Sequence, residues 1–144
     1  MKRIIAHTGF TREEIICLHT SSSYTVYMSG FLPGFPYLGD LPKELHVPRL
    51  DKPRLQVAKG TVGIGGTQTG IYPIESPGGW NIIGRTPVDL YCLERTKPFL
   101  IRAGDQLSFR QIALGDFNEM KENLAREPEM IKQFVKEGLR CEST

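Results

Sequence analysis

The sequence predicts a mainly β fold, an antiparallel barrel or sandwich, with a short helix near its N-terminus and a helical tail. Several short segments rich in strand-forming residues are bounded by glycine, proline or charged residues. No crossover helix of the kind that a parallel sheet needs separates these segments. The length of 144 residues is sufficient for one domain with a single core. We therefore expect one β domain followed by a helical appendage.

The first two elements follow from helix capping and from residue alternation. Thr11 is a capping residue, and Glu14 stands three positions later, which predicts a short helix that continues to about Leu18. Residues 24–29 alternate so that every second side chain shares one face, and they are of strand-forming types. We place the first strand there.

Residues 30–53 hold five of the ten prolines. Proline removes backbone donors and pushes the preceding residue to an extended conformation, so the sequence predicts a long, stiff loop. After this loop, short strands are expected at Arg54–Ala58, Thr61–Gly65, Val88–Leu93, Phe99–Ile101 and Gln106–Ile112.

The character of the sequence changes at residue 115, so we divide the chain into a β domain, residues 1–114, and an amphipathic helical tail, residues 115–144. The first segment of the tail is capped by Asp116, and the second starts at Pro128 and stops near Gly138. Both segments carry apolar residues at helical spacing. An apolar stripe docked on the barrel explains this pattern, and a partner-binding or dimerising helix is the alternative.

Charge and cysteine usage exclude several classes of protein. The chain has 18 basic and 16 acidic residues and a net charge of +2, too balanced for a nucleic-acid binder that relies on phosphate neutralisation. The three cysteines are far apart and form no Cys-x-x-Cys pair, which favours a reducing cytoplasm. The apolar start is too short for a secretory signal, and no apolar run reaches membrane-spanning length. We expect a cytoplasmic protein without nucleic-acid or membrane partners.

No motif predicts a catalytic residue or a metal site. His7, His19 and His46 lack metal-ligand spacing. The segment Gly63–Gln68 lacks the third glycine of a dinucleotide fingerprint and the Gly-Lys-Ser/Thr ending of a phosphate loop. Ser76 does not lie in a Gly-x-Ser-x-Gly nucleophile elbow. We therefore expect no catalytic residue, no metal and no cofactor in the isolated domain.

Aromatic residues gather in two stretches rich in proline and glycine, residues 31–38 and 72–83. Residues 60–84 hold eight of the fifteen glycines, which indicates tight turns or a close approach of another chain or ligand to the backbone. Rigid aromatic side chains bury large areas at low entropic cost. We expect the two stretches to converge on an exposed protein-binding groove, and a plug at one end of the barrel is the alternative.

Four runs, in order along the chain, resemble the KipI family, also called PxpB or the B subunit of 5-oxoprolinase and once described as allophanate hydrolase subunit 1. They are Gly30–Gly39 (GFLPGFPYLG), Val47–Arg49 (VPR), Gly66–Pro73 (GTQTGIYP) and Ser76–Pro87 (SPGGWNIIGRTP). The resemblance spans Ile5 to Ile112 and corresponds to the family's C-terminal domain, so we expect the family's N-terminal domain to be absent here. The chain departs from the family at Asp40, where relatives often carry glycine.

The resemblance implies a fold and two roles. It implies a cyclophilin-like closed antiparallel β-barrel. One implied role is that of a subunit of the bacterial ATP-dependent 5-oxoprolinase, which opens 5-oxoproline to glutamate with KipA/PxpC-like and PxpA-like partner subunits. The other is inhibition of the autophosphorylation of a sporulation sensor histidine kinase by binding its dimerisation and phosphotransfer domain. The full enzyme complex would use ATP, whereas the isolated domain is expected to bind without catalysing a reaction.

Two sets of residues are candidates for these roles. The first would grip an apolar or proline-containing segment of a protein partner, the kinase dimerisation domain above all. The second would offer donors to a carboxylate or phosphate in a composite 5-oxoprolinase site, the alternative function. The partner-binding set is Phe31, Pro33, Phe35, Pro36, Tyr37, Tyr72 and Trp80, and the composite-site set is Arg49, Arg54, Gln68 and Arg85.

Overall fold

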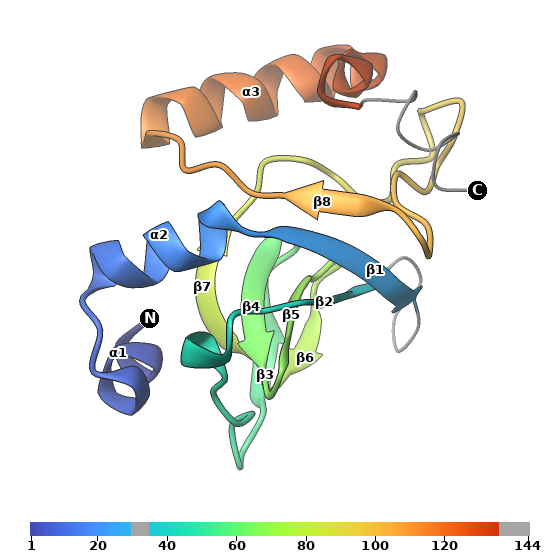
Figure 1. Cartoon of the computed structure of the whole chain (residues 1–144). Helices are drawn as coiled ribbons and strands as arrows, with labels where there is room; N and C mark the ends of the chain where they lie inside the picture. The colour runs from blue at the N-terminus through green and yellow to red at the C-terminus, as the bar shows by residue number, and fades with distance from the viewer. Residues whose placement is uncertain (30–34, 136–144) are drawn as a thin grey trace.

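The computed structural model describes residues 1–29 and 35–135 (Figure 1). Its strands are β1 (Ser23–Ser29), β2 (Pro36–Gly39), β3 (Arg54–Val57), β4 (Thr61–Gly65), β5 (Gln68–Ile71), β6 (Ser76–Gly78), β7 (Asn81–Arg85) and β8 (Gln106–Ser108). Its helices are α1 (Lys2–Thr8), α2 (Arg12–Ser21) and α3 (Leu114–Arg126), with 3-10 helices η1 (Lys43–Leu45) and η2 (Pro128–Phe134). The strands pair antiparallel in a six-stranded sheet, order β7-β4-β5-β2-β1-β8, and a two-stranded sheet of β3 and β6. The predicted mainly β fold is confirmed.

The described strands do not close into a barrel, so the prediction of a closed barrel is wrong. Strands β7 and β8 are the two edges of the large sheet. Between them the chain forms turns and one isolated bridge from Tyr91 to Phe99, in place of the two strands expected at 88–93 and 99–101. Pro87 and Pro98 lack the N–H group that a paired strand needs, which explains why this segment does not join the edges.

Strand β2 lies inside the segment that is predicted to be a loop, and β5, β6 and β7 lie inside the glycine-rich segment. These strands are missed because proline and glycine weaken the local strand signal. Pairing with neighbours supplies the stability instead: β2 is held between β1 and β5, and β4 is held between β5 and β7. The tertiary environment therefore overrides the local preference of these residues.

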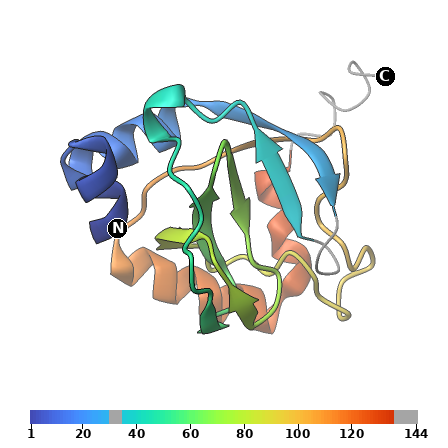
Figure 2. The same cartoon turned by 90° about the horizontal axis from the view of Figure 1, so that it is seen from below.

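Two helices cover one end of the sheet, as Figure 2 shows. The predicted helix is confirmed as α2, and the hydroxyl of its N-cap residue Thr11 accepts a hydrogen bond of 3.1 Å from the Glu14 backbone N–H. Helix α1 is not among the predicted elements. Gly9 ends it with φ of 78°, a left-handed conformation that glycine adopts without strain and that turns the chain into α2. Ile4 and Ile15 are the fully buried apolar residues of the two helices.

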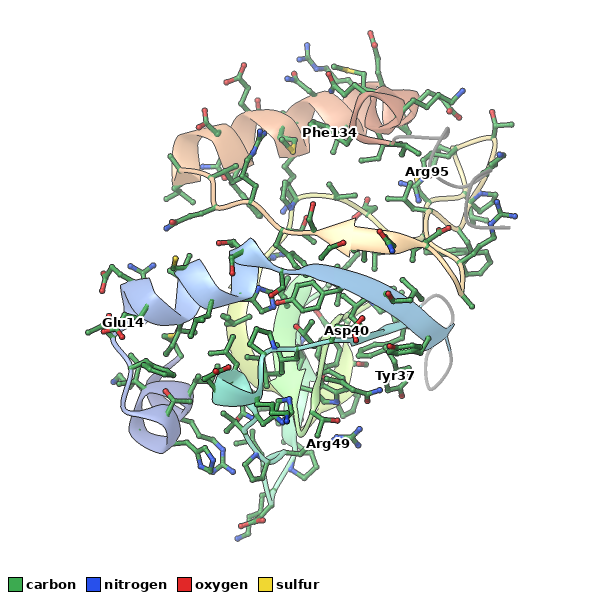
Figure 3. All side chains as sticks on the ribbon, in the orientation of Figure 1. Glu14, Tyr37, Asp40, Arg49, Arg95 and Phe134 are labelled. Atoms are coloured by element: carbon green, nitrogen blue, oxygen red, sulfur yellow. The ribbon has the colours of Figure 1, made fainter. Side chains whose placement is uncertain are left out.

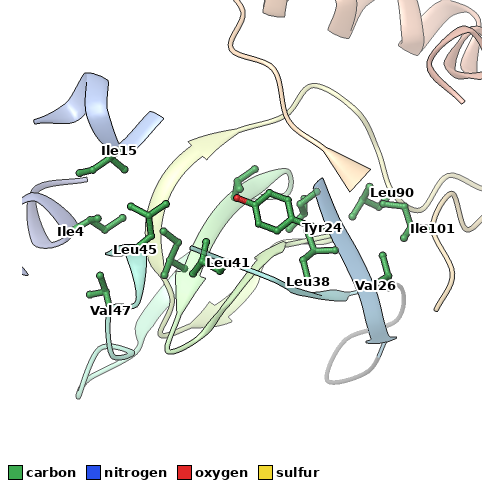
Figure 4. Packing of buried hydrophobic residues seen from close by; sticks show 13 residues of the cluster. Ile4, Ile15, Tyr24, Val26, Leu38, Leu41, Leu45, Val47, Leu90 and Ile101 are labelled. Atoms are coloured by element: carbon green, nitrogen blue, oxygen red, sulfur yellow. The ribbon is translucent and has the colours of Figure 1, made fainter. Parts of the chain in front are cut away.

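The main core lies between these helices and the concave side of the large sheet (Figure 4). The first strand contributes as predicted, because Tyr24 and Val26 are both buried. The cluster draws on the N-terminal helices, the large sheet and the segment after β7. Its buried members are Ile4, Ile15, Tyr24, Val26, Leu38, Leu41, Leu45, Val47, Val62, Ile64, Ile71, Leu90 and Ile101.

Asp40 follows β2 with φ of 68°, the one described residue other than glycine that has a positive φ. Its carboxylate accepts a hydrogen bond of 3.2 Å from the Tyr27 hydroxyl. Aspartate tolerates this left-handed conformation better than most residues, and glycine adopts it freely. This backbone requirement explains why relatives of the family can carry glycine at the position.

The tail begins at Leu114, with Ala113 as its N-cap, so the predicted cap at Asp116 is wrong and Asp116 lies in the first turn. Helix α3 runs beside β8, on the far side of β8 from β1 in Figure 1, and it contacts η2. Leu114 and Phe134 are exposed. The predicted stop at Gly138 lies outside the described residues. None of the helices in the described part of the chain has the length and apolarity that crossing a bilayer requires.

A buried polar chain links α2 to the middle of the sheet. The Thr69 hydroxyl donates a hydrogen bond of 2.8 Å to the Gly63 carbonyl, so its oxygen accepts from the His19 Nε2–H at 2.9 Å. The Tyr24 hydroxyl donates to the His19 carbonyl at 2.7 Å. Burial lowers the pKa of His19 to about 4 from its ordinary value of 6.5. His19 is therefore neutral in the folded protein at neutral pH.

We expect stability to fall as the pH drops from about 6.5 towards 4, because the unfolded chain binds a proton at His19 that the folded chain does not. At pH 4.5 this difference amounts to about 2–3 kcal/mol. Chemical denaturation of the wild type and of His19→Gln at pH 7 and pH 4.5 checks it, since glutamine can keep the bond to Thr69 without titrating. An equal loss of stability in both proteins would contradict the assignment.

Candidate functional site

The two predicted aromatic stretches do converge. Phe35 packs edge-on against Trp80, with ring centroids 5.4 Å apart, and against Tyr72 at 5.3 Å. Tyr37 lies 5.0 Å from Phe35 and 6.0 Å from Trp80. Together with Val57 these four rings form a second apolar cluster, separate from the main core, which we call the ring cluster.

Glycines of β4, β5 and β6 form the surface on which the ring cluster packs. A Cβ atom at Gly65 would lie 2.7 Å from the Trp80 ring, and one at Gly70 would lie 3.0 Å from the Phe35 ring. A Cβ atom at Gly78 would lie 2.1 Å from the Tyr72 hydroxyl. Real Cβ atoms essentially never approach other atoms as closely as at Gly65 and Gly78, and the contact at Gly70 is tighter than nearly all real ones. These glycines are therefore required by aromatic packing within the chain, and not by turns.

The rings do not present an exposed groove, so that prediction is wrong for the rings that the structure describes. Phe35 and Tyr72 are fully buried, Trp80 is 6% exposed, and Tyr37 is half-buried. Pro36 is buried as well. The physical reason is that ring-on-glycine packing removes these large apolar surfaces from water inside the chain itself. The candidates Phe31 and Pro33 lie outside the described residues, so their partner-binding role stays a prediction.

Two arginines lie at the ring cluster. The Arg49 guanidinium stands over the Trp80 ring, with its Cζ 5.3 Å from the ring centroid, a cation–π contact. Arg54, which pairs with Gly78 across β3 and β6, donates from Nη1 to the Trp80 carbonyl at 3.0 Å. Both residues are exposed. No ion pair is found for either within residues 1–29 and 35–135, so both charges are available to a ligand.

Tyr72 carries a poorly satisfied polar atom within the ring cluster. Its hydroxyl is buried, and the Trp80 backbone approaches it without forming a hydrogen bond of good geometry. Burial raises the pKa of Tyr72, a shift that the nearby Trp80 backbone and the positive charges of Arg49 and Arg54 oppose. The phenol is therefore a neutral donor that lies close to two guanidinium groups. The two exposed guanidinium groups suit the recognition of an oxyanion, whereas the enclosed hydroxyl is not accessible to a ligand in this conformation.

The other two members of the predicted composite-site set lie at opposite ends of β4. Gln68 pairs with Gly65, the residue under the Trp80 ring, whereas Arg85 pairs with Thr61. These ends are about 13 Å apart along the strand. The Arg85 Nε donates to the Lys59 carbonyl at 3.3 Å. The structure therefore brings Arg49 and Arg54 together at Trp80, sets Gln68 on the same end of the strand, and places Arg85 elsewhere.

Sequence reasoning missed the Tyr72 hydroxyl as a candidate, because it treated Tyr72 only as a ring. The spacing of Gly63 and Gly65 on one face of a strand is the signal that indicates ring packing, although the same spacing is also compatible with turns.

Figure 3 shows Tyr37 and Arg49 near each other, below β1. No group of histidine, cysteine or acidic side chains suited to a metal ion occurs among the described residues.

Comparison with known proteins yields one family match and several relatives. The family model described as carboxyltransferase domain, subdomain C and D, matches residues 1–101. The B subunit of 5-oxoprolinase from Escherichia coli O157:H7 is 50% identical over 106 residues, which are 74% of this chain and 49% of that protein. The B subunit of 5-oxoprolinase from Bacillus subtilis strain 168 is 48% identical over 110 residues, which are 76% of this chain and 46% of that protein.

A solved structure supports the fold. The crystal structure of a conserved uncharacterized protein from Pyrococcus horikoshii is similar with a TM-score of 0.76 and 43% identity, and the match covers 81% of this chain and 54% of that one. The chain spans about half the length of the curated relatives described above. What those relatives do as whole proteins therefore depends on further sequence that this chain does not match.

We expect Gly65→Ala to destabilise the protein by about 1–3 kcal/mol, because the new Cβ overlaps the buried Trp80 ring and forces it to shift. Gly84→Ala in β7 is the matched control. Nothing lies within 4 Å of its Cβ position, so a change within about 0.5 kcal/mol is expected. Urea denaturation measures both, and equal effects would contradict the packing argument.

We expect Tyr72→Phe to leave stability unchanged or to raise it, because the substitution removes a buried hydroxyl that has no partner among the described residues. Tyr24→Phe is the matched comparison, since its hydroxyl donates to the His19 carbonyl and its loss should cost about 1–2 kcal/mol. Thermal denaturation of both variants tests this difference. A destabilised Tyr72→Phe would mean that the hydroxyl has a structural partner.

Proposed function

Because the chain belongs to the family of carboxyltransferase domains, subdomain C and D, we propose that it acts as the C-terminal half of a 5-oxoprolinase B-type subunit. The observation that carries this proposal is the 50% identity, over 106 residues, with the curated protein of that name from Escherichia coli. The resemblance found in the sequence motifs is thereby confirmed. A subunit of this name implies other subunits, so the chain would work within a complex, and ATP-driven opening of 5-oxoproline to glutamate would be the activity of that complex.

Within such a complex, the surface over the ring cluster is the part of this chain that we assign to substrate. 5-Oxoproline carries a carboxylate, and an arginine fork binds a carboxylate with two parallel hydrogen bonds. The cation–π contact with Trp80 positions the Arg49 guanidinium, and Arg54 adds a second positive charge through its bond to the Trp80 carbonyl. The chain would thus bind and orient substrate, while a partner subunit would supply the ATP-dependent chemistry.

Inhibition of a sensor histidine kinase stays a prediction that rests on the motif resemblance alone. None of the relatives named above carries a name that refers to a kinase. The rings that were expected to grip the kinase dimerisation domain are mostly buried, so such a contact would have to use other atoms of this surface. We therefore place the 5-oxoprolinase role first.

A chimeric subunit tests the proposed function. In it, the 106 matched residues of the Escherichia coli relative are replaced by the matching residues of this chain, and the rest of the relative is kept. We expect the chimera to assemble with the partner subunits and to restore ATP-dependent formation of glutamate from 5-oxoproline. The proposal fails if the folded chimera assembles but shows no turnover above that of the complex without it.

The same chimera tests the arginine assignment through Arg49→Gln. Losing one charge-assisted contact should raise KM for 5-oxoproline at least tenfold while leaving the stability unchanged. Arg12→Gln is the control, because Arg12 is an exposed arginine at the start of α2 on another part of the molecule. Equal KM values in the two variants would remove Arg49 from the substrate site and leave the subunit assignment intact.

A further inference from the structure

A second cavity, lined by both charged and apolar side chains, lies between the loop after β7 and the tail. A cavity of about 170 Å³ opens there, with walls from residues 95–102 on one side and residues 129–135 on the other. Four of its lining side chains are cationic and one is acidic. They are Arg95, Lys97, Arg102 and Lys132, and Glu129. Figure 3 places Arg95 and Arg49 on opposite sides of β1 and β8, so this cavity is not the site over the ring cluster.

Arg95 is the unusual member of this group, because it is a buried cation, 7% exposed, without a carboxylate partner among the described residues. Its Nη1 donates to the Asp89 carbonyl, and its Nη2 donates to the Pro98 carbonyl at 2.9 Å. Its Nε is buried and has no hydrogen-bond partner within the described ranges. A guanidinium has five N–H donors, so the two Nη groups keep one N–H each beyond these bonds, while the enclosed Nε–H cannot reach a ligand without a local movement.

The acidic side chain that lines the cavity is already engaged, and the Asp105 carboxylate accepts a hydrogen bond of 2.9 Å from the Arg102 backbone N–H. Glu129 accepts a hydrogen bond of 2.6 Å from the Thr96 backbone N–H and forms an ion pair of 3.2 Å with Lys132. It therefore neutralises Lys132, and no ion pair is found for Arg95, Lys97 or Arg102 among the described residues. Lys97 and Arg102 are exposed, whereas Arg95 is buried, and burying a charge without a partner is costly, so Arg95 favours an anion from outside the described residues.

We propose that this cavity binds a phosphate group, either as the free ion or on a small phosphorylated molecule. Several uncompensated positive charges favour a dianion over a carboxylate, which carries a single charge. The planar guanidinium suits bidentate contact with phosphate oxygens. Because one wall belongs to the tail, a bound phosphate would also bridge the loop at Arg95 to the segment at Lys132. The cavity volume is sufficient for a phosphate group with a small substituent.

The test is a titration of the full chain with inorganic phosphate at constant ionic strength, followed by calorimetry. The double substitution Lys97→Gln and Arg102→Gln removes two exposed cations that have no described ion pair and should weaken binding at least tenfold. Arg95→Lys should weaken it by at least as much, since lysine lacks the planar fork. Lys43→Gln, an exposed lysine in η1, is the matched control and should leave the affinity unchanged.

Two further arms decide the ligand class. Acetate at the same ionic strength should bind at least tenfold more weakly than phosphate, and a simple phosphate monoester should bind as tightly as inorganic phosphate. The proposal is overturned if the wild type shows no heat of binding at millimolar phosphate, if acetate binds equally well, or if the double variant binds like Lys43→Gln. None of these results depends on 5-oxoprolinase activity, so the phosphate site and the proposed function can fail separately.

Discussion

Direct contact between aromatic rings and glycine backbone is the constraint on which this structure depends. Trp80 occupies the space that a side chain at Gly65 would need, and Phe35 does the same at Gly70. The glycines lie on paired strands, β4 and β5, so the two rings meet on one continuous surface without Cβ atoms. Through this contact, segments that are far apart in the sequence pack against each other. It also fixes the plane of the indole that Arg49 covers.

A buried polar atom without a good hydrogen bond costs free energy of folding, so stability does not explain why it is present. The Tyr72 hydroxyl lies in the ring cluster, and Arg95 Nε lies in the loop beside the tail. In both places exposed cationic side chains lie nearby, and these favour negatively charged ligands. Asn81 Oδ1 is a third such atom, but the Asn81 amide nitrogen donates to the Pro48 and Ile64 carbonyls, which gives that side chain a structural role.

This chain matches about half the length of the 5-oxoprolinase B subunits, so its proposed role depends on the residues in that half. The family match ends at residue 101, while the helical tail continues beyond it. The matched part carries the ring cluster and its two arginines, the features that we assign to substrate. The tail contributes one wall of the phosphate cavity, with Lys132 and Glu129. The substrate surface that we propose thus lies within the family match, and the proposed phosphate site is built partly from sequence outside it.

The sequence by itself determined the β class, the helix capped by Thr11, the strand through Tyr24 and Val26, and the family, because each depends on local spacing or on a continuous motif. Tertiary structure alone decided that the rings face inward and that Arg85 lies apart from Arg49. It also decided that the sheet stays open at β7 and β8. Those outcomes depend on pairing and burial between segments distant in the chain. The local sequence does not distinguish a glycine that forms a turn from a glycine that lies beneath an aromatic ring.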